Sequence, residues 1–137
     1  MEKETKNLIQ IVSDMDENTK AAYNIRENGS CAARHTTENI DIITKTDKPG
    51  IDIKVKPNTK GETVYIPALV THENVKDLVY NDFYVGEGSD IIISAGCGVH
   101  NDGCGTSEHN GIHRFFIGKN AHVLYLEKHV GTKIMVD

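Results

Sequence analysis

The chain has 137 residues, a mass of 15.1 kDa and a formal net charge of −5, which is the composition of one ordinary globular domain. Its 15 Lys and Arg residues are scattered rather than gathered into a stripe, so the sequence lacks the electrostatic footprint of a nucleic-acid-binding protein. No apolar run reaches signal or membrane-spanning length, and three cysteines are an odd number for a disulfide framework. We therefore expect a cytoplasmic protein that binds neither nucleic acid nor membranes.

The N-terminal segment, residues 1–22, is predicted to be helical. Apolar residues recur there at approximately helical spacing among charged ones, and this signal extends over residues 3–23. The residues of this stripe are Leu8, Ile9, Ile11, Val12 and Met15. The dipeptide Asn28-Gly29 is a turn signal, and β-branched residues become frequent after it.

From residue 40 onward the sequence indicates short strands separated by turns. Strands are predicted over 40–44, 51–56, 63–70 and 77–85. Residues 51–56 alternate strictly between apolar and charged side chains, which is typical of a strand with one solvated face. Because proline cannot donate a hydrogen bond to a neighbouring strand, Pro67 is expected at a sheet edge or a bend.

An internal repeat relates two segments at an offset of 32 residues. The sequence FYVGEGSDIIIS at 83–94 matches the pattern of FFIGKNAHVLYL at 115–126, with Gly86 and Gly118 at equivalent positions. Each copy predicts strand, tight turn and strand. A repeated unit of this size favours stacked coils, as in a parallel β-helix, but an antiparallel sandwich or a cupin-like barrel built of hairpins also fits.

A series of segments in a fixed order resembles the SufB/SufD family, and more narrowly its short clostridial and archaeal branch. These segments are AAYNIRENG (21–29), RHTTENIDI (34–42), KTDKPGIDIKVKP (45–57), DLVYNDFYVGE (77–87), AGCGVHNDG (95–103) and HNGIHRFFIGKNAHVLYLEKH (109–129). The resemblance implies a right-handed parallel β-helix core over residues 23–137. It also implies a non-catalytic, cytoplasmic scaffold for assembling iron-sulfur clusters. The implied partners are a SufC-type ABC ATPase and a SufB/SufD-like subunit or a second copy of the chain.

The chain departs from the family at its C-terminal end. Family members continue into further β-helix coils and a helical segment that docks the ATPase, and their known cluster ligands lie in that later part. No residue of this sequence inherits those ligand roles, and the docking segment is expected to be missing. We therefore expect a truncated core whose open apolar end self-associates or pairs with another β-helix subunit.

A ligand-rich stretch lies between the two copies of the repeat. Cys97, His100 and Cys104 form C-x2-H-x3-C, and His109 and His113 follow at H-x3-H spacing. Thiolates and imidazoles suit zinc or iron, so these five residues are the candidate metal ligands. Cys97, His100 and Cys104 are the first choices, and His109 and His113 come second together with Asp102 and Glu108. An iron-sulfur cluster is the cofactor that the resemblance implies.

The same stretch also fits roles that need no metal. Its glycines are typical of turns, and Cys97 can pack inward as a small apolar residue. A metal-dependent enzyme on a cupin-like barrel is a further hypothesis, but we do not expect His109 and His113 to share one face of a strand. A third hypothesis is a metal-free module whose function is pairing through the open coil end. The sequence leaves these alternatives open.

Overall fold

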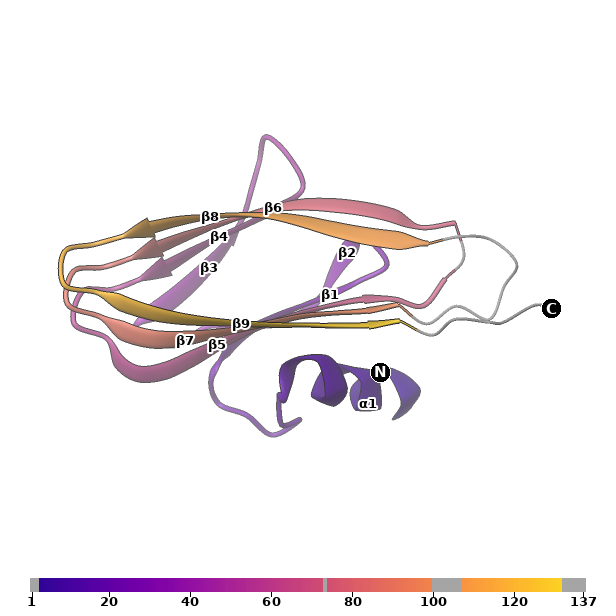
Figure 1. The fold of residues 1–137 in the computed structure, drawn as a ribbon, viewed down its shortest axis with the longest axis horizontal. Helices are drawn as coiled ribbons and strands as arrows, with labels where there is room; N and C mark the ends of the chain where they lie inside the picture. The colour runs from indigo at the N-terminus through magenta and orange to yellow at the C-terminus, as the bar shows by residue number, and fades with distance from the viewer. Residues whose placement is uncertain (1–2, 73, 100–106, 132–137) are drawn as a thin grey trace.

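The computed structural model describes residues 3–72, 74–99 and 107–131, and these form one helix and nine strands in two facing sheets (Figure 1). The elements are α1 (Lys3–Ser13), β1 (Ala22–Glu27), β2 (Ser30–His35), β3 (Ile40–Thr44), β4 (Gly50–Val55), β5 (Lys60–Val70), β6 (Lys76–Val85), β7 (Asp90–Val99), β8 (Glu108–Ile117) and β9 (His122–Gly131). The fold is therefore mainly β, as the sequence predicts.

The two sheets are built by a chain that alternates between them. The larger sheet has the order β2-β1-β5-β7-β9 and the smaller has the order β3-β4-β6-β8. The β1–β2 and β3–β4 ladders are antiparallel, whereas the other five ladders are parallel. The alternative of an antiparallel sandwich or cupin-like barrel is wrong, because antiparallel pairing among the described residues is confined to the β1–β2 and β3–β4 hairpins.

The internal repeat corresponds to the strand register. The β6–β8 and β7–β9 ladders both pair residues 32 positions apart, for example Phe83 with Phe115. At the turns between these strands, Gly88 has a φ of 71° and Asn120 a φ of 59°, the left-handed conformation expected for both residue types. The repeat thus places like residues side by side, and the Phe83 and Phe115 rings stack with centroids 4.9 Å apart.

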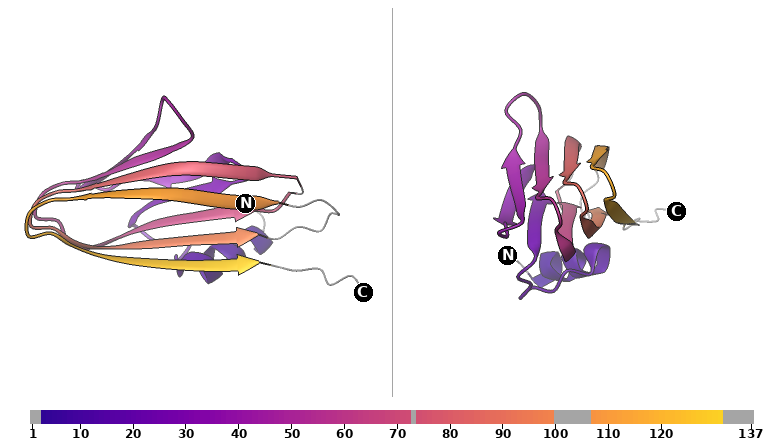
Figure 2. Two further views of the ribbon diagram at one scale, coloured as in Figure 1. Left: turned by 45° about the horizontal axis from the view of Figure 1, so that its top comes forward. Right: turned by 90° about the vertical axis from the view of Figure 1, so that its left-hand side faces the viewer.

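The helix is shorter than predicted and lies on the outer face of the larger sheet (Figure 2). It ends at Ser13, and Asp14 follows with a φ of 58°, which stops the helical backbone well before residue 22. No helix in the described ranges is long and apolar enough to cross a membrane. The prediction of a helix to residue 23 fails because the apolar stripe itself ends at Met15.

Two glycines expected to form turns belong instead to strand β7, where they allow the helix to dock. A Cβ atom at Gly96 would overlap the backbone of Val12, and one at Gly98 would meet the Leu8 side chain at 2.7 Å. Both glycines are buried, and Cys97 between them points to the opposite face of the sheet. The interpretation of Gly96 and Gly98 as turn residues is therefore wrong.

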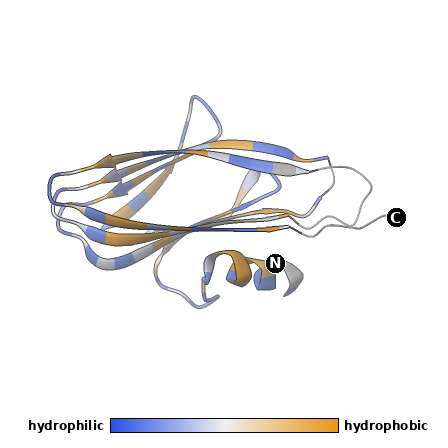
Figure 3. Ribbon diagram, viewed as in Figure 1, coloured by the Kyte–Doolittle hydropathy of each residue, from blue (hydrophilic) through white to orange (hydrophobic). Residues whose placement is uncertain are grey.

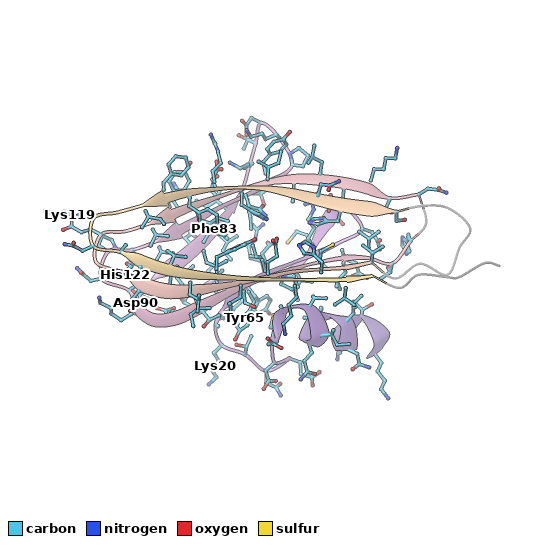
Figure 4. The ribbon with its side chains drawn as sticks, in the orientation of Figure 1. Lys20, Tyr65, Phe83, Asp90, Lys119 and His122 are labelled. Carbon is cyan, nitrogen blue, oxygen red and sulfur yellow. The ribbon has the colours of Figure 1, made fainter. Side chains whose placement is uncertain are left out.

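Apolar packing divides into two clusters on opposite faces of the larger sheet. The main cluster lies between the sheets, near the turns that join β6 to β7 and β8 to β9, and Phe83 is labelled there in Figure 4. The second cluster lies under the helix and contains Ile9, Val12, Met15, Ile25 and Leu69. Figure 3 shows hydrophilic stretches on β6 and β8 towards the other end of the sheets.

Pro67 is buried inside the larger sheet, not at its edge. Strand β5 pairs with β7 on one side and with β1 on the other. The β1–β5 register, however, passes from Tyr23–Tyr65 directly to Arg26–Ala68. Pro67 therefore sits where the ladder is interrupted and its missing N–H group is tolerated.

Candidate functional site

A cavity of about 260 Å³ lies between the two sheets, beyond the main apolar cluster. Its polar lining is formed by Asn24, Arg26, Asn81, Cys97, His109, Asn110, His113, Glu127 and His129. Ligand pockets in proteins are usually lined mainly by apolar residues. A space between two β-sheets is normally filled by apolar side chains. This concentration of ionisable groups therefore marks the cavity as the candidate functional site.

Strand register explains why these groups meet. Side chains at alternate positions of a strand point to the same face, so inward positions of neighbouring strands form rows. Along these rows Asp77 pairs with His109 and Asn81 with His113 in the smaller sheet. In the larger sheet Ala95 pairs with Glu127 and Cys97 with His129. The ionisable groups are thus concentrated on β8 and β9, the last strands of their sheets.

A buried ion pair fixes one histidine of the cavity. The Arg26 guanidinium donates hydrogen bonds to Asp77, with Nε 2.9 Å from Oδ2 and a terminal nitrogen 2.8 Å from Oδ1. His109 donates from Nδ1 to Asp77 Oδ2 at 2.8 Å. In the neutral imidazole, this hydrogen bond places the lone pair of His109 on Nε2.

The environment of Asp77 keeps its carboxylate charged. Burial by itself raises the pKa of Asp77, but the hydrogen bonds from His109 and Arg26 outweigh it and hold the pKa well below its ordinary value. Only 4% of the Asp77 side chain is exposed, so water contributes little to its solvation. Arg26 and His109 therefore supply the polar partners that a buried carboxylate requires.

A second cluster surrounds Glu127 on strand β9. One carboxylate oxygen of Glu127 lies 3.8 Å from His113 Nε2, and the other lies 3.4 Å from His129 Nε2. The Tyr125 hydroxyl donates a hydrogen bond of 3.1 Å to Glu127 Oε1. Burial lowers the pKa of His113, although Glu127 acts in the opposite direction. The cluster therefore holds a neutral imidazole beside a carboxylate.

Cys97 is a buried thiol that stays protonated without a cation. Burial raises the pKa of Cys97 to about 11, and the negative charges of Asp77 and Glu127 act in the same direction. The predicted inward packing of Cys97 is confirmed. Since the thiolate is the form that binds metals, a metal ion entering the cavity has to displace this proton.

Three of the five predicted metal ligands line the cavity. They are Cys97, His109 and His113. His100, Cys104 and Asp102 lie outside the described residues, as does the side chain of Glu108. The expectation that His109 and His113 do not share a strand face is wrong, because four residues are an even number of steps along a strand and return the side chain to the same face.

Sequence reasoning does not select Arg26, Asp77, Asn81, Glu127 or His129 as site residues. The 32-residue offset contains the missing signal for three of them, since it aligns Cys97 with His129, His109 with Asp77 and His113 with Asn81. Glu127 follows from His129 because the two are separated by two positions on one strand. Nothing in the sequence pattern indicates Arg26, whose strand belongs to an earlier turn of the chain.

Within the described residues, no group of three or more His, Cys, Asp or Glu side chains stands ready to hold a metal ion. The arrangement nevertheless gathers a thiol, three imidazoles and a carboxylate around one cavity. No family model, curated protein or solved structure matches this chain in the comparisons. The site must therefore be interpreted from its own chemistry.

Proposed function

We propose that this protein is a non-catalytic scaffold component of cytoplasmic iron-sulfur cluster assembly. The observation that carries the proposal is the cavity that gathers Cys97, the imidazoles of His109, His113 and His129, and the Glu127 carboxylate. These are the ligand types that iron accepts from proteins. The segments that line the cavity also belong to the stretch that resembles the SufB/SufD family.

The proposal accounts for a buried thiol placed among charged groups. A cysteine that served only to fill space would be expected among apolar neighbours. Cys97 instead faces a cavity whose ionised carboxylates disfavour its thiolate, so the site favours an incoming cation over deprotonation alone. A ferrous ion would supply that cation, and sulfide would complete the ligands of a nascent cluster.

We further propose that the two sheets are part of a right-handed parallel β-helix. The alternation of parallel strands between two sheets and the 32-residue offset shared by the β6–β8 and β7–β9 ladders support this architecture. Further coils or a SufB/SufD-like subunit would then continue the sheets beyond β8 and β9. A SufC-type ABC ATPase would act through such a partner.

Anaerobic reconstitution with ferrous iron and sulfide tests the scaffold function. The chain is incubated alone, and then with a SufB/SufD-like partner and its ATPase, and the visible absorbance of an iron-sulfur cluster is recorded. We expect cluster absorbance in the wild type and a loss of most of it in Cys97→Ser. Cys31→Ser is the matched control, because Cys31 is an exposed cysteine outside the cavity lining.

Two results would contradict the proposal. Absence of cluster absorbance under every condition would refute direct cluster binding. Equal absorbance in Cys97→Ser and Cys31→Ser would show that any cluster forms elsewhere. Circular dichroism of each variant separates loss of ligand from loss of fold, and the small size of the Cys-to-Ser change makes the comparison fair.

A metal-free pairing module is the second candidate function. It is favoured by the apolar residues that β8 and β9 leave uncovered, since Phe115 is 38% exposed where its counterpart Phe83 is fully buried. An end of this kind is suited to a second β-sheet subunit. Light scattering of the metal-free chain tests this function. A chain that stays monomeric alone and forms no complex with a SufB/SufD-like subunit would refute it.

A further inference from the structure

We propose that the cavity binds a single divalent first-row metal ion between His113, Glu127 and His129, with His109 as a fourth ligand and without sulfide. The Glu127 carboxylate lies between two imidazoles from different positions on β8 and β9. Two imidazoles and one carboxylate are the donor set used by non-haem Fe(II) sites. This inference deepens the proposed function. The choice of iron as the metal rests on that function.

The distances within the cluster are close to those of a metal site. Ligand atoms held about 2.1 Å from one ion at ordinary coordination angles lie about 3.0–3.4 Å from each other. The 3.4 Å separation of His129 Nε2 from Glu127 falls in this range, and the 3.8 Å separation of His113 Nε2 from Glu127 exceeds it by a few tenths of an ångström. The His129 side chain is 67% exposed, so it can rotate onto an ion without disturbing the core.

Gly111 brings the imidazole of His113 towards His109. A Cβ atom at position 111 would meet His113 Nε2 at 2.9 Å and Cε1 at 3.0 Å. The ring therefore leans over the glycine that separates the two histidines on strand β8. Because Gly111 has no left-handed backbone angle, its role here is the space that it leaves for the ring.

The surroundings of the histidines are suited to metal binding. Metal-ligating histidines usually donate their other ring N–H to a carboxylate or another acceptor. His109 already does so, because its Nδ1 donates to Asp77, which Arg26 holds in place. The Asn81 amide nitrogen Nδ2 lies 3.5 Å from His113 Nδ1, and a flip of the amide would present its oxygen as the acceptor for this ring N–H.

The charge balance of the cavity also favours a cation. The Arg26 charge is matched by Asp77, and the carboxylate of Glu127 remains for the ion. A divalent cation beside Glu127 would therefore meet a negative charge that Arg26 does not neutralise.

Co²⁺ binding to the 137-residue chain, followed by its visible absorption and by calorimetry without sulfide, tests the inference. We expect one Co²⁺ per chain, and an affinity weakened at least about tenfold in Glu127→Gln, His129→Ala and Gly111→Ala. Gly111→Ala is the most informative variant, because it removes no ligand and only pushes the His113 ring away. His122→Ala is the matched control, since His122 is an exposed histidine at the opposite, turn end of the sheets (Figure 4).

The outcomes separate this inference from the proposed function. Wild-type chain that binds no Co²⁺ or Fe²⁺, or Gly111→Ala and His129→Ala that bind as tightly as wild type, would overturn the metal site. The result of cluster reconstitution has no bearing on this test of the metal site. Conversely, a chain that binds one Co²⁺ as described but forms no cluster with iron, sulfide and partners would refute the scaffold function alone. Since His129 is largely exposed, its variant stays folded and keeps the test decisive.

Discussion

The space between the two sheets has an apolar half and a polar half. The two halves differ in where apolar side chains pack. In the apolar half, side chains such as Phe83 and Ile93 are fully buried between the sheets. In the polar half, His109, His113 and Glu127 surround a cavity instead. There the apolar packing moves to the outside of the larger sheet, where α1 covers it.

This difference suggests how a β-structure can accommodate a polar interior. Burying apolar area is the main favourable term in folding, so a cavity lined by ionisable groups lowers stability unless packing elsewhere replaces it. The helix provides that replacement directly behind the cavity. The helix packs against Gly96 and Gly98 on one face of β7, while Cys97 between them faces the cavity. We therefore expect the two halves to respond differently to substitution.

The largest effect is expected in the apolar half, from Phe83→Ala. Phe83 is fully buried and stacks on Phe115, so its removal leaves a cavity and should lower the free energy of unfolding by about 3–5 kcal/mol. Urea denaturation measures this change. Phe115→Ala is the control in β8, and its cost should be clearly smaller because that ring is 38% exposed. Equal losses would mean that the end of the sheets is covered in solution.

The apolar half is also the part that the sequence predicts well. Alternation over 51–56 and the 32-residue repeat indicate strands in positions that the structure confirms, since periodicity directly reports which face is buried. The prediction for the helix end is wrong although the apolar stripe ends at Met15, whereas the prediction for Gly96 is wrong for a reason that lies outside the local sequence. The role of Gly96 depends on contact between α1 and β7, which are about 80 residues apart, and no local pattern reports such contacts.

In the polar half, the largest expected effect comes from Asp77→Ala. This change leaves the Arg26 guanidinium without its buried partner, which should cost about 3 kcal/mol of unfolding free energy. The double variant Arg26→Met with Asp77→Leu removes both charges and should recover much of the loss. Thermal and urea unfolding of the three proteins provide the comparison. A double variant less stable than Asp77→Ala would show that the pair itself stabilises the fold.

A pH dependence of stability should follow from the same carboxylate. The pKa of Asp77 is lowered in the folded protein, so its contribution is complete above the unfolded pKa of about 4 and is lost as pH falls towards the folded value. We expect a loss on the order of 2 kcal/mol between about pH 5 and the acid limit. Urea midpoints across this range measure it, and Asp77→Asn should flatten the slope. An unchanged slope would assign the acid sensitivity to other carboxylates.

The candidate site could be predicted only in part. Its residues come from one stretch of sequence, from strand pairing across the repeat and from a distant strand. Cys97, His109 and His113 are visible as ligand types in one stretch of sequence. Pairing across one repeat adds His129, which the 32-residue offset places beside Cys97, and Glu127 follows because it lies two positions from His129 on the same strand. Arg26 joins through a strand of an earlier turn of the chain, at a distance that no repeat encodes.

The smallest effect, and the one that bears most directly on the division of the core, is expected from Gly96→Ala. The added methyl group would overlap the backbone of Val12, so α1 has to shift, at a cost of about 1–2 kcal/mol. Gly131→Ala in β9 is the control, since a Cβ there meets nothing within 4 Å. Limited proteolysis should release residues 1–13 faster from Gly96→Ala only. If α1 does not stabilise the cavity, detachment of the helix will leave the affinity of the cavity for Co²⁺ unchanged. If the helix supplies the packing that the polar half lacks, the same substitution will weaken Co²⁺ binding although it lies on the opposite face of β7.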